Sequence, residues 1–289
     1  MMESAELLQR ESFVEKNARQ RVQHLVDAGT LRELLDPFER LSSPWLGLQD
    51  IVTQADDGVV IARGKIDGVA VVVAAIEPAF QGGSMGEVGG AKIAGALELA
   101  LEDARAGKPV VPVLLLETGG VRLQEANCGL AAIAEIHAAI VALRAHVPVI
   151  GVISGPVGCF GGMSIAAGLC STLIATREAR LGLNGPQVIE QEAGVDEFDS
   201  RDRPMIWSLT GGAQRHACHL VDKLCDDDAA EIRTAIARAV AQPVADLPRT
   251  QAVDAHLAQL RSLDTSRRAD AEWARQVMAH DIHGAGDPS

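Results

Sequence analysis

The sequence predicts an α/β fold, because strands and helices alternate along the chain from about residue 58 to residue 225. The predicted strands are continuous runs of Val, Ile and Leu, such as PVVPVLLLE at 109–117 and VPVIGVISG at 147–155. Such runs are typical of parallel strands that are buried on both faces. Hydrophobic residues make up 47% of the 289 residues and aromatic residues only 3%, so we expect an aliphatic core.

The first elements are predicted from helical periodicity and turn residues. Residues 1–45 are expected to form a helical lead-in, in which ARQRVQHLVDAG stops at a glycine. Residues 58–78 predict two strands joined at Asp67-Gly68, a favourable hairpin pair. A glycine-rich loop at 82–90 precedes an amphipathic helix over 92–107.

The later elements continue the alternation. A buried strand at 109–117 precedes a long helix at 122–145, and a strand at 147–155 precedes a glycine loop and helix at 156–170. We then expect two short strands in 171–183, a loop with a short helix in 184–194, and helical or mixed segments at 212–223 and 228–241. No break in composition marks a second domain, so residues 1–289 are predicted to form one domain with a helical C-terminal extension over 228–289.

Charge, cysteine spacing and hydropathy limit the partners and the location that we expect for the chain. The net charge of −13 disfavours nucleic acid and anionic membranes as general partners. The five cysteines form no CxxC pair, and their irregular spacing favours reduced thiols and a cytoplasmic location. The stretch MMESAELLQRESF has no apolar signal-peptide core. The apolar stretch 128–143 contains Glu135 and His137 and predicts a buried helix, because it is too short and polar for a membrane span.

Two glycine loops are the main candidates for a site. ETGG at 117–120 and GPVGCFGG at 155–162 each follow a buried strand and precede a helix. Glycine leaves backbone N–H groups unshielded, and a helix N-terminus attracts negative charge. Two such loops on neighbouring strands can converge on one oxygen atom and form an oxyanion hole. Plain turns are the commoner explanation of such glycines, and both interpretations stay open at this point.

Other kinds of site have less support. Neither GxxxxGK[ST] nor a suitable GxGxxG follows a strand, and no GxSxG elbow is present. Ser84, Ser154 and Ser164 lie near glycine loops, but no His and Asp are indicated as their partners, so each is interpreted as a turn or cap hydroxyl. The stretch RHACH places His216 and His219 three residues apart, which without further ligands predicts no metal site.

Three stretches together resemble the carboxyltransferase branch of the crotonase/ClpP superfamily in order and spacing. They are GGSMGEVGGAKIAGALELAL, TGGVRLQEA, and GPVGCFGG followed by LNGPQVIEQ. The helix and loop ARQRVQHLVDAGTLRELLDPF is also similar, and the resemblance covers about residues 20–225. Within this branch the sequence is most similar to the beta subunits of biotin-independent malonate decarboxylases, and GGVRLQEAN stands where acyl-CoA carboxyltransferases usually carry GGAR-type sequences.

The resemblance implies a crotonase-like fold of repeated ββα units with its site at the two glycine loops. It implies catalytic backbone amides at Gly119, Gly120, Gly161 and Gly162. The residues that it implies in substrate binding are Val121, Arg122, Asn184, Gly185, Pro186 and Gln187. Serine hydrolase relatives place their nucleophile near the start of the second helix, where this chain has glycines, so protease activity is not expected.

The implied reaction is decarboxylation of a malonyl thioester that is carried on the phosphopantetheine-type arm of an acyl carrier protein. The amides stabilise the resulting enolate, and acetyl thioester forms after protonation. The resemblance implies no metal or other cofactor bound by this chain. The implied partners are a gamma subunit that completes the site, the acyl carrier protein and an acyltransferase subunit.

Two alternative functions stay open. In the first, the chain is a carboxyltransferase subunit of a biotin-dependent malonate decarboxylase or of an acyl-CoA carboxylase. In the second, it is a non-catalytic scaffold half of the complex. Bacterial acetyl-CoA carboxylase beta subunits begin with a four-cysteine zinc ribbon, whereas this chain has no cysteine before Cys128. Carrier proteins are usually acidic, as this chain is, so docking requires the partner subunit or a basic patch, for which Arg122, Arg177 and Arg180 are candidates.

Overall fold

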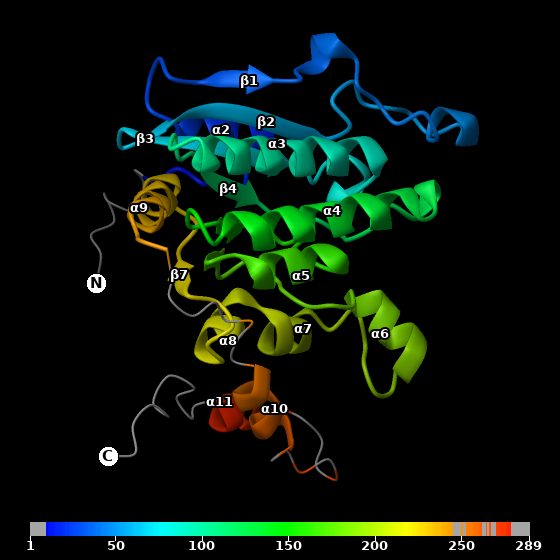
Figure 1. Cartoon of the computed structure of the whole chain (residues 1–289). Coiled ribbons are helices and arrows are strands. Elements are labelled where there is room, and N and C mark those ends of the chain that lie inside the picture. Colours follow the sequence, from blue (N-terminus) through cyan, green and yellow to red (C-terminus); the bar gives the residue numbers. More distant parts are fainter. Residues whose placement is uncertain are drawn as a thin grey trace, which may run out of the picture.

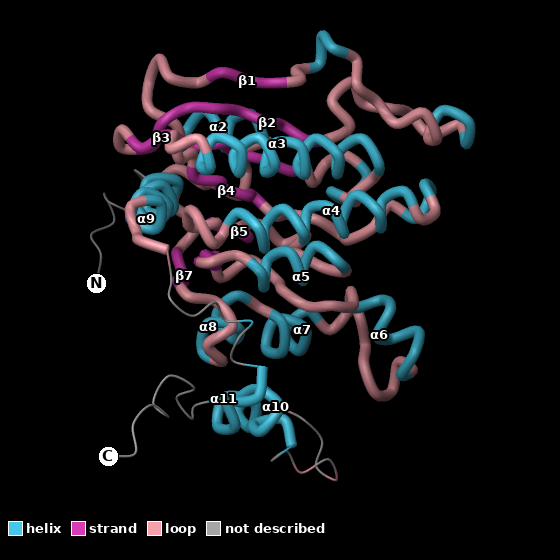
Figure 2. The backbone as a smooth tube through the Cα atoms, viewed as in Figure 1, coloured by secondary structure: helices cyan, strands magenta, loops and turns pink. Residues whose placement is uncertain are grey.

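One seven-stranded sheet organises the computed structural model, which describes residues 10–244, 250, 253–261, 264, 266 and 270–278. The strands follow one another across the sheet in chain order, and they are drawn in magenta in Figure 2. The first three pair in antiparallel fashion: β1 (Arg32–Leu34), β2 (Val59–Ile66) and β3 (Val69–Ile76). Parallel pairing runs from β3 through β4 (Val111–Leu115), β5 (Ile150–Ile153), β6 (Thr172–Thr176) and β7 (Lys223–Cys225). The predicted α/β fold is confirmed.

Helices cover the sheet on both sides. Figure 1 shows α3 (Glu87–Arg105), α4 (Cys128–Leu143) and α5 (Gly162–Leu169) side by side in front of it. Behind β2 and β3 lies α2 (Ala18–Leu25), and α9 (Ala229–Val240) packs against β5, β6 and β7. The remaining helices are α6 (Pro186–Ala193), α7 (Arg203–Thr210), α8 (Gly212–Ala217), α10 (Val253–Arg261) and α11 (Ala271–Met278). Short 3-10 turns cover Pro37–Glu39, Gly47–Gln49, Gln81–Gly83 and Leu123–Glu125.

The core is aliphatic, as the composition predicts. Strand residues such as Val73, Val113, Ile150 and Leu173 are completely buried between the helix layers. Burial on both faces explains why these strands are continuous apolar runs rather than alternating ones. The core therefore fixes the strand ends, from which the glycine loops leave.

The hairpin at Asp67-Gly68 has the predicted geometry. Asp67 and Gly68 have φ values of 48° and 82°, and Ile66 pairs with Val69 across the turn. Positive φ at both central residues is the requirement of a type I′ turn. The prediction of two strands over 58–78 is confirmed.

The N-terminal segment differs from the expected helical lead-in over 1–45. Within residues 10–45 the only α-helix is α2, and β1 follows it as the edge strand of the sheet. Leu34 pairs with Ile61 of β2, so tertiary pairing overrides the local helical preference. Residues 1–9 lie outside the described residues.

Three further expectations differ in their boundaries. α4 begins at Cys128 rather than at residue 122, because a 3-10 turn and Ala126, with φ of 51°, interrupt the chain before it. α3 begins at Glu87, so residues 87–90 of the expected loop 82–90 are helical. Gly90 lets this helix approach Ala132 of α4. Of the two short strands expected in 171–183 only β6 forms, and Arg180 and Leu181 make isolated bridges instead.

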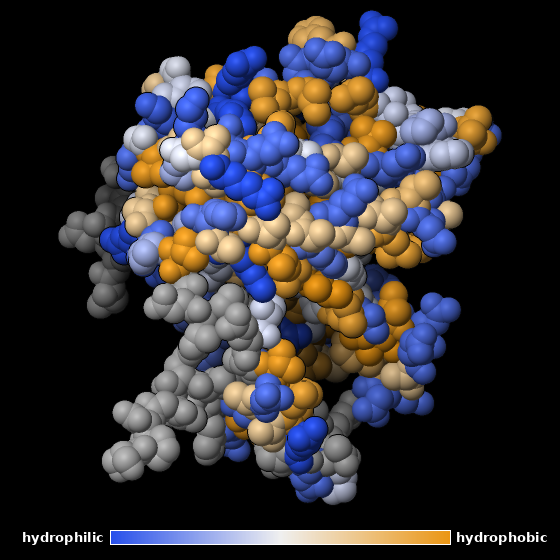
Figure 3. Space-filling view, viewed as in Figure 1, coloured by the Kyte–Doolittle hydropathy of each residue, from blue (hydrophilic) through white to orange (hydrophobic). Residues whose placement is uncertain are grey.

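The surface of the helix layer is partly apolar. α4 is buried on one face only, since Leu130 and Val141 are 50% and 45% exposed. Figure 3 shows apolar residues running across α4 and α5 towards α6. Ile165 of α5 and Val188 of α6 are also exposed. Within the described part of the chain, no helix has the length and apolar character needed to cross a bilayer. All five cysteines are free thiols.

Candidate active site

The first glycine loop (residues 117–122) and the second glycine loop (residues 155–162) lie against each other. Thr118 and Cys159 form a parallel bridge, in which the Thr118 N–H donates to Gly158 O at 2.7 Å and the Phe160 N–H donates to Thr118 O at 3.1 Å. A Cβ added to Gly161 would lie 3.2 Å from the Cα of Gly120. Loops that follow two neighbouring parallel strands therefore meet at one edge of the sheet, as an oxyanion site requires.

Most of the glycine amides named from the sequence are already engaged. The N–H of Gly119 donates to Gly82 O at 2.9 Å, and the N–H of Gly120 donates to Thr118 Oγ1 at 3.1 Å. The N–H of Gly161 donates to Leu183 O at 2.7 Å. In this conformation these three amides hold the loops together and are not free for a ligand.

Among residues 119–121, 161 and 162, the N–H groups of Val121 and Gly162 have no hydrogen-bond partner in the described part of the chain. Met85 donates to Gly120 O at 2.7 Å and accepts from the Arg122 N–H at 2.8 Å, so the N–H of Val121 points away from Met85. The Val121 nitrogen lies 3.7 Å from the position of a Cβ on Gly161. Gly162 is the first residue of α5, where an N–H has no partner in the helix. The two free amides thus come from the two glycine loops.

Glycine is required at the centre of this arrangement. Gly161 has φ of 61° and ψ of −148°, a combination that residues with a Cβ essentially never adopt. Gly120 has φ of 110° and packs against the Phe160 carbonyl and the Gly161 Cα. These backbone conformations set the direction of the peptides on either side.

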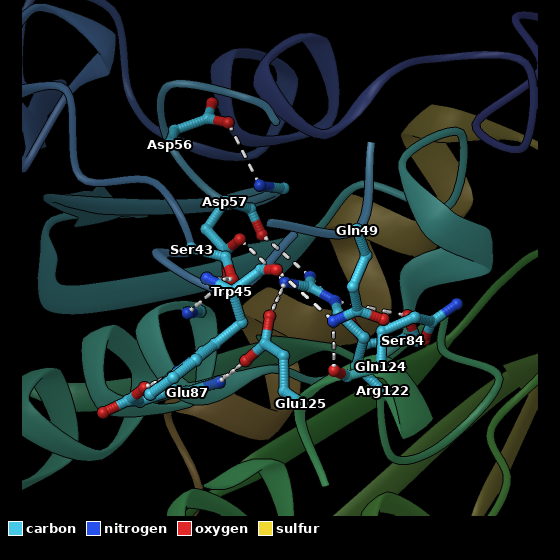
Figure 4. A network of polar contacts seen from close by, with 12 residues as sticks. Ser43, Trp45, Gln49, Asp56, Asp57, Ser84, Glu87, Arg122, Gln124 and Glu125 are labelled. Carbon is cyan, nitrogen blue, oxygen red and sulfur yellow. Dashed lines mark hydrogen bonds and ion pairs between the residues drawn. The ribbon is translucent and has the colours of Figure 1, made fainter. Parts of the chain in front are cut away.

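Arg122 lies behind the first glycine loop in a buried charge cluster, shown in Figure 4. Its guanidinium is 1% exposed and bonds Asp57 Oδ1 at 2.7 Å and Glu125 Oε1 at 2.8 Å. It also donates to Ser84 O at 2.9 Å and stacks on the Phe80 ring. The resemblance implied Arg122 in substrate binding, but the structure places this side chain in the interior, where it holds the loop.

The two carboxylates of this cluster have opposite pKa shifts. Burial raises the pKa of Asp57, although Arg122 and the Gly89 N–H oppose that shift. Burial also acts to raise the pKa of Glu125, but hydrogen bonds from the Glu87 N–H, Ser43 and Arg122 outweigh it and hold this pKa below its ordinary value. Glu125 is therefore the member of the cluster that is stabilised as a carboxylate.

A second buried ion pair begins the first glycine loop. Glu117 bonds Arg21 of α2 at 2.6 Å, and both side chains are nearly unexposed. A Cβ on Gly155 would overlap the Glu117 carboxylate, so Glu117 also fixes where the second glycine loop leaves β5. Sequence reasoning missed this pair, because its members are 96 residues apart and no local pattern connects them.

The segment 184–187 lies beside the second glycine loop. The chain before it runs along that loop, with the Cys159 N–H donating to Arg180 O at 2.9 Å. Pro186 is buried at the start of α6, Gly185 is half-buried, and Asn184 and Gln187 are exposed. Asn184 and Gln187 are thus accessible near the loops, and their role in substrate binding stays a prediction.

The three candidate docking arginines do not form a patch. Arg122 is buried, and Arg180 lies between the Phe160 and Trp207 rings while donating to Pro156 O at 2.8 Å. Arg177 is exposed but bonds Asp226 at 3.0 Å. Docking of an acidic carrier by these side chains is therefore not favoured.

The histidines of RHACH have ordinary structural positions. His216 Nδ1 lies 2.9 Å from Val221 O, and His219 follows the end of α8 with φ of 57°. Among the described residues, no group of three or more His, Cys, Asp or Glu side chains is arranged to hold a metal ion.

Comparison with known proteins gives consistent matches. The profile of the carboxyl transferase domain family matches residues 14–277. The malonyl-S-ACP:biotin-protein carboxyltransferase of Malonomonas rubra is 40% identical over 250 residues, which cover 83% of this chain and 79% of that protein. The methylmalonyl-CoA carboxyltransferase 12S subunit of Propionibacterium freudenreichii subsp. shermanii is 33% identical over 75% of this chain, but only 39% of its own length is covered.

Solved structures are similar over nearly the whole chain. A chain of a Pseudomonas malonate decarboxylase hetero-tetramer, crystallised with malonate, has a TM-score of 0.93 and 62% identity, and the match covers 95% of this chain and all of that one. A chain of a Pseudomonas MdcD–MdcE hetero-dimer has a TM-score of 0.76 and 56% identity over 89% of this chain. The neighbours are carboxyltransferases of the crotonase-like fold, so that expectation is confirmed.

Proposed function

This chain belongs to the carboxyl transferase domain family, and on that premise we propose that it is the decarboxylating beta subunit of a malonate decarboxylase. In this proposal it is a carbon–carbon lyase that converts a malonyl thioester on an acyl carrier protein to acetyl thioester and CO2. The observation that carries the proposal is the pair of unpartnered amides, Val121 and Gly162, at the meeting point of the two glycine loops.

The chemistry follows from what these amides can stabilise. When the bond between C2 and the carboxylate carbon breaks, CO2 leaves and the electron pair delocalises into the thioester carbonyl. Negative charge then develops on that oxygen, and two fixed N–H donors stabilise it more strongly than they stabilise the neutral ground state. Protonation of C2 completes the reaction. The dipole of α5, whose first residue is Gly162, adds to the positive potential at the site.

Partner subunits complete the proposed enzyme. We propose a gamma subunit at the site, an acyl carrier protein that presents the thioester on its phosphopantetheine-type arm, and an acyltransferase that loads the carrier. The hetero-dimeric and hetero-tetrameric malonate decarboxylases of Pseudomonas support such an assembly. The exposed apolar side chains on α4 and α5 are also consistent with a partner subunit.

A second candidate is carboxyl transfer to biotin. The 40% identity to a malonyl-S-ACP:biotin-protein carboxyltransferase favours it, and its transition state needs the same stabilised enolate oxygen. The two candidates are separated by CO2 release from carrier-bound malonyl thioester, using this chain co-expressed with its gamma partner. Release that is insensitive to avidin supports the direct decarboxylase, whereas release that avidin abolishes supports the biotin-dependent reaction.

A matched pair of variants tests whether the chain is catalytic or only a scaffold. A Cβ at position 162 meets Ile133 whatever the residue, so Gly162→Ala and Gly162→Pro share that cost. Only proline removes the N–H, and the first position of a helix tolerates proline. We expect Gly162→Pro to turn over about 10²–10³-fold more slowly than Gly162→Ala. Equal turnover in equally assembled complexes would favour the scaffold.

A further inference from the structure

The peptide between Gly161 and Gly162 is hydrogen-bonded at its carbonyl by one residue, Ser164. The Ser164 N–H donates to Gly161 O at 3.0 Å, and the Ser164 hydroxyl donates to the same oxygen at 2.7 Å. The opposite end of this peptide is the free N–H of Gly162. Ser164 therefore acts directly on the peptide that supplies one of the two free amides.

Hydrogen bonding at a carbonyl strengthens the N–H of the same peptide as a donor. Each bond polarises the amide and, by condensed-phase estimates, strengthens the next bond in the chain by roughly 10–30%. The two bonds also fix the peptide plane, which sets the direction of the Gly162 N–H. No orienting cost is then incurred when charge develops on the bound oxygen.

The first glycine loop has the same arrangement with a different donor. The peptide that carries the Val121 N–H ends in the Gly120 carbonyl, which accepts from the Met85 N–H at 2.7 Å. The short bond there comes from a backbone N–H, and the Thr118 hydroxyl adds a long contact to the same oxygen at 3.5 Å. In the second glycine loop the shorter of the two bonds to the carbonyl comes from a side chain, the Ser164 hydroxyl at 2.7 Å.

The next peptide is also held from outside the loop. His137 of α4 has its Nε2 2.7 Å from the Gly162 carbonyl oxygen. Since a carbonyl oxygen only accepts, Nε2 carries the proton in this contact. Gly162 is thus fixed on both sides, by Ser164 through the preceding peptide and by His137 through the following one.

We propose that Ser164 is a positioning residue for the reaction, whose hydroxyl orients and polarises the Gly162 amide without touching the substrate. The inference rests on the proposed function. Its competitor is a hydroxyl that only stabilises the first turn of α5. Ser208 of α7 provides the matched control, because its hydroxyl donates to the carbonyl three residues earlier, Met205 O, at the same 2.7 Å.

The test measures kcat, KM and melting temperature for the assembled complex with carrier-bound malonyl thioester. The variants are Ser164→Ala, Ser164→Cys, Ser164→Thr and Ser208→Ala. We expect Ser164→Ala to lower kcat about three- to tenfold, the range for one lost hydrogen bond, with KM changed less than about twofold. Threonine keeps the hydroxyl and should remain within about twofold of the wild type, and the weaker thiol donor of cysteine should be intermediate. Ser208→Ala should leave kcat unchanged.

Several outcomes would overturn the inference. One is a Ser164→Ala kcat equal to that of Ser208→Ala, and another is a loss that threonine does not restore. If avidin abolishes CO2 release, the kcat of each variant relative to wild type is measured for carboxyl transfer to biotin instead. The inference is then tested under the second candidate function. A wild-type complex that performs neither reaction removes the proposed function and the inference together. A wild-type complex that turns over while Ser164 behaves like Ser208 removes the inference alone.

Discussion

The two glycine loops each contribute a free amide where they meet, that of Val121 and that of Gly162, yet they are held in place by different interactions. The first glycine loop is held by buried ion pairs to remote elements, Arg21–Glu117 and the cluster of Arg122 with Asp57 and Glu125. The second glycine loop is held by hydrogen bonds at its backbone, among them those of Ser164, His137 and Leu183 O. The first glycine loop is therefore held by buried ion pairs, and the second by hydrogen bonds to its backbone, one of which comes from the Arg180 guanidinium to Pro156 O.

This difference has energetic consequences. Removing one partner of a buried ion pair costs about 3–5 kcal/mol, because the remaining charge is left unpaired in the interior. A single neutral hydrogen bond contributes about 0.5–1.5 kcal/mol. We therefore expect side-chain substitutions around the first glycine loop to affect stability, and those around the second to affect activity more than stability.

The largest expected effect is on activity and comes from Gly161→Ala. Alanine is strained at φ of 61° and its Cβ meets Gly120, so both free amides are displaced. We expect kcat to fall about 10²–10³-fold, the cost of a lost oxyanion donor. Gly168→Ala in α5 is the control, since its Cβ meets open space and its kcat should not change. A fully active Gly161→Ala complex would show that loop geometry does not matter.

The largest expected effect on stability comes from Arg122→Met. Asp57 and Glu125 lose their cation, and we expect the free energy of unfolding in urea to fall by about 3–5 kcal/mol. Arg233 also bridges two carboxylates, Asp27 and Asp67, but at the surface with 29% exposure. Arg233→Met should cost less than about 1 kcal/mol. Equal losses would contradict a special role of burial at the first glycine loop.

The third prediction concerns pH. Because the folded-state pKa of Glu125 lies below its ordinary 4.5, its carboxylate contributes stability above that pH, and this contribution is lost as pH falls through the lowered pKa. Glu125→Gln should therefore be less stable than wild type at pH 7, and the difference should shrink as the pH falls below about 4.5. The stability difference between the two proteins is measured from urea unfolding midpoints at about pH 3 to 7, a range that includes the ordinary pKa of a glutamate. Glu98→Gln, exposed on α3, serves as the control. A difference that does not depend on pH would rule out Glu125 ionisation as the cause.

The smallest expected effect concerns the second glycine loop alone. His137→Ala should cost about 1 kcal/mol of stability and should also lower kcat a few-fold, because it releases the Gly162 carbonyl. His216→Ala removes a similar contact between a histidine ring and a carbonyl, 2.9 Å from Val221 O, and should cost similar stability without lowering kcat. Thermal melts and turnover of the assembled complex measure both variants. A lower kcat in both would assign the effect to general loosening.

The sequence by itself determined the α/β alternation, the hairpin at Asp67-Gly68 and the position of the glycine loops at the strand ends. Each of these depends on local information, namely apolar runs, turn residues with positive φ, and glycines after a strand. The edge strand β1 was not predicted, because its extended conformation depends on pairing with β2 rather than on its own residues.

Only the tertiary structure decided which amides are free and what Arg122 does. Of the four amides that the resemblance implied, those of Gly119, Gly120 and Gly161 are engaged and that of Gly162 is free, and the N–H of Val121 is the second free donor. The local sequence GGVRLQEAN predicts an exposed cation at Arg122. The side chain is buried instead, because Asp57, 65 residues earlier, packs against it. The physical reason is the same in both cases. A hydrogen-bonding group can bind a ligand only when no neighbouring group already bonds it. Its neighbours are set by the packing of the strands and not by the local sequence.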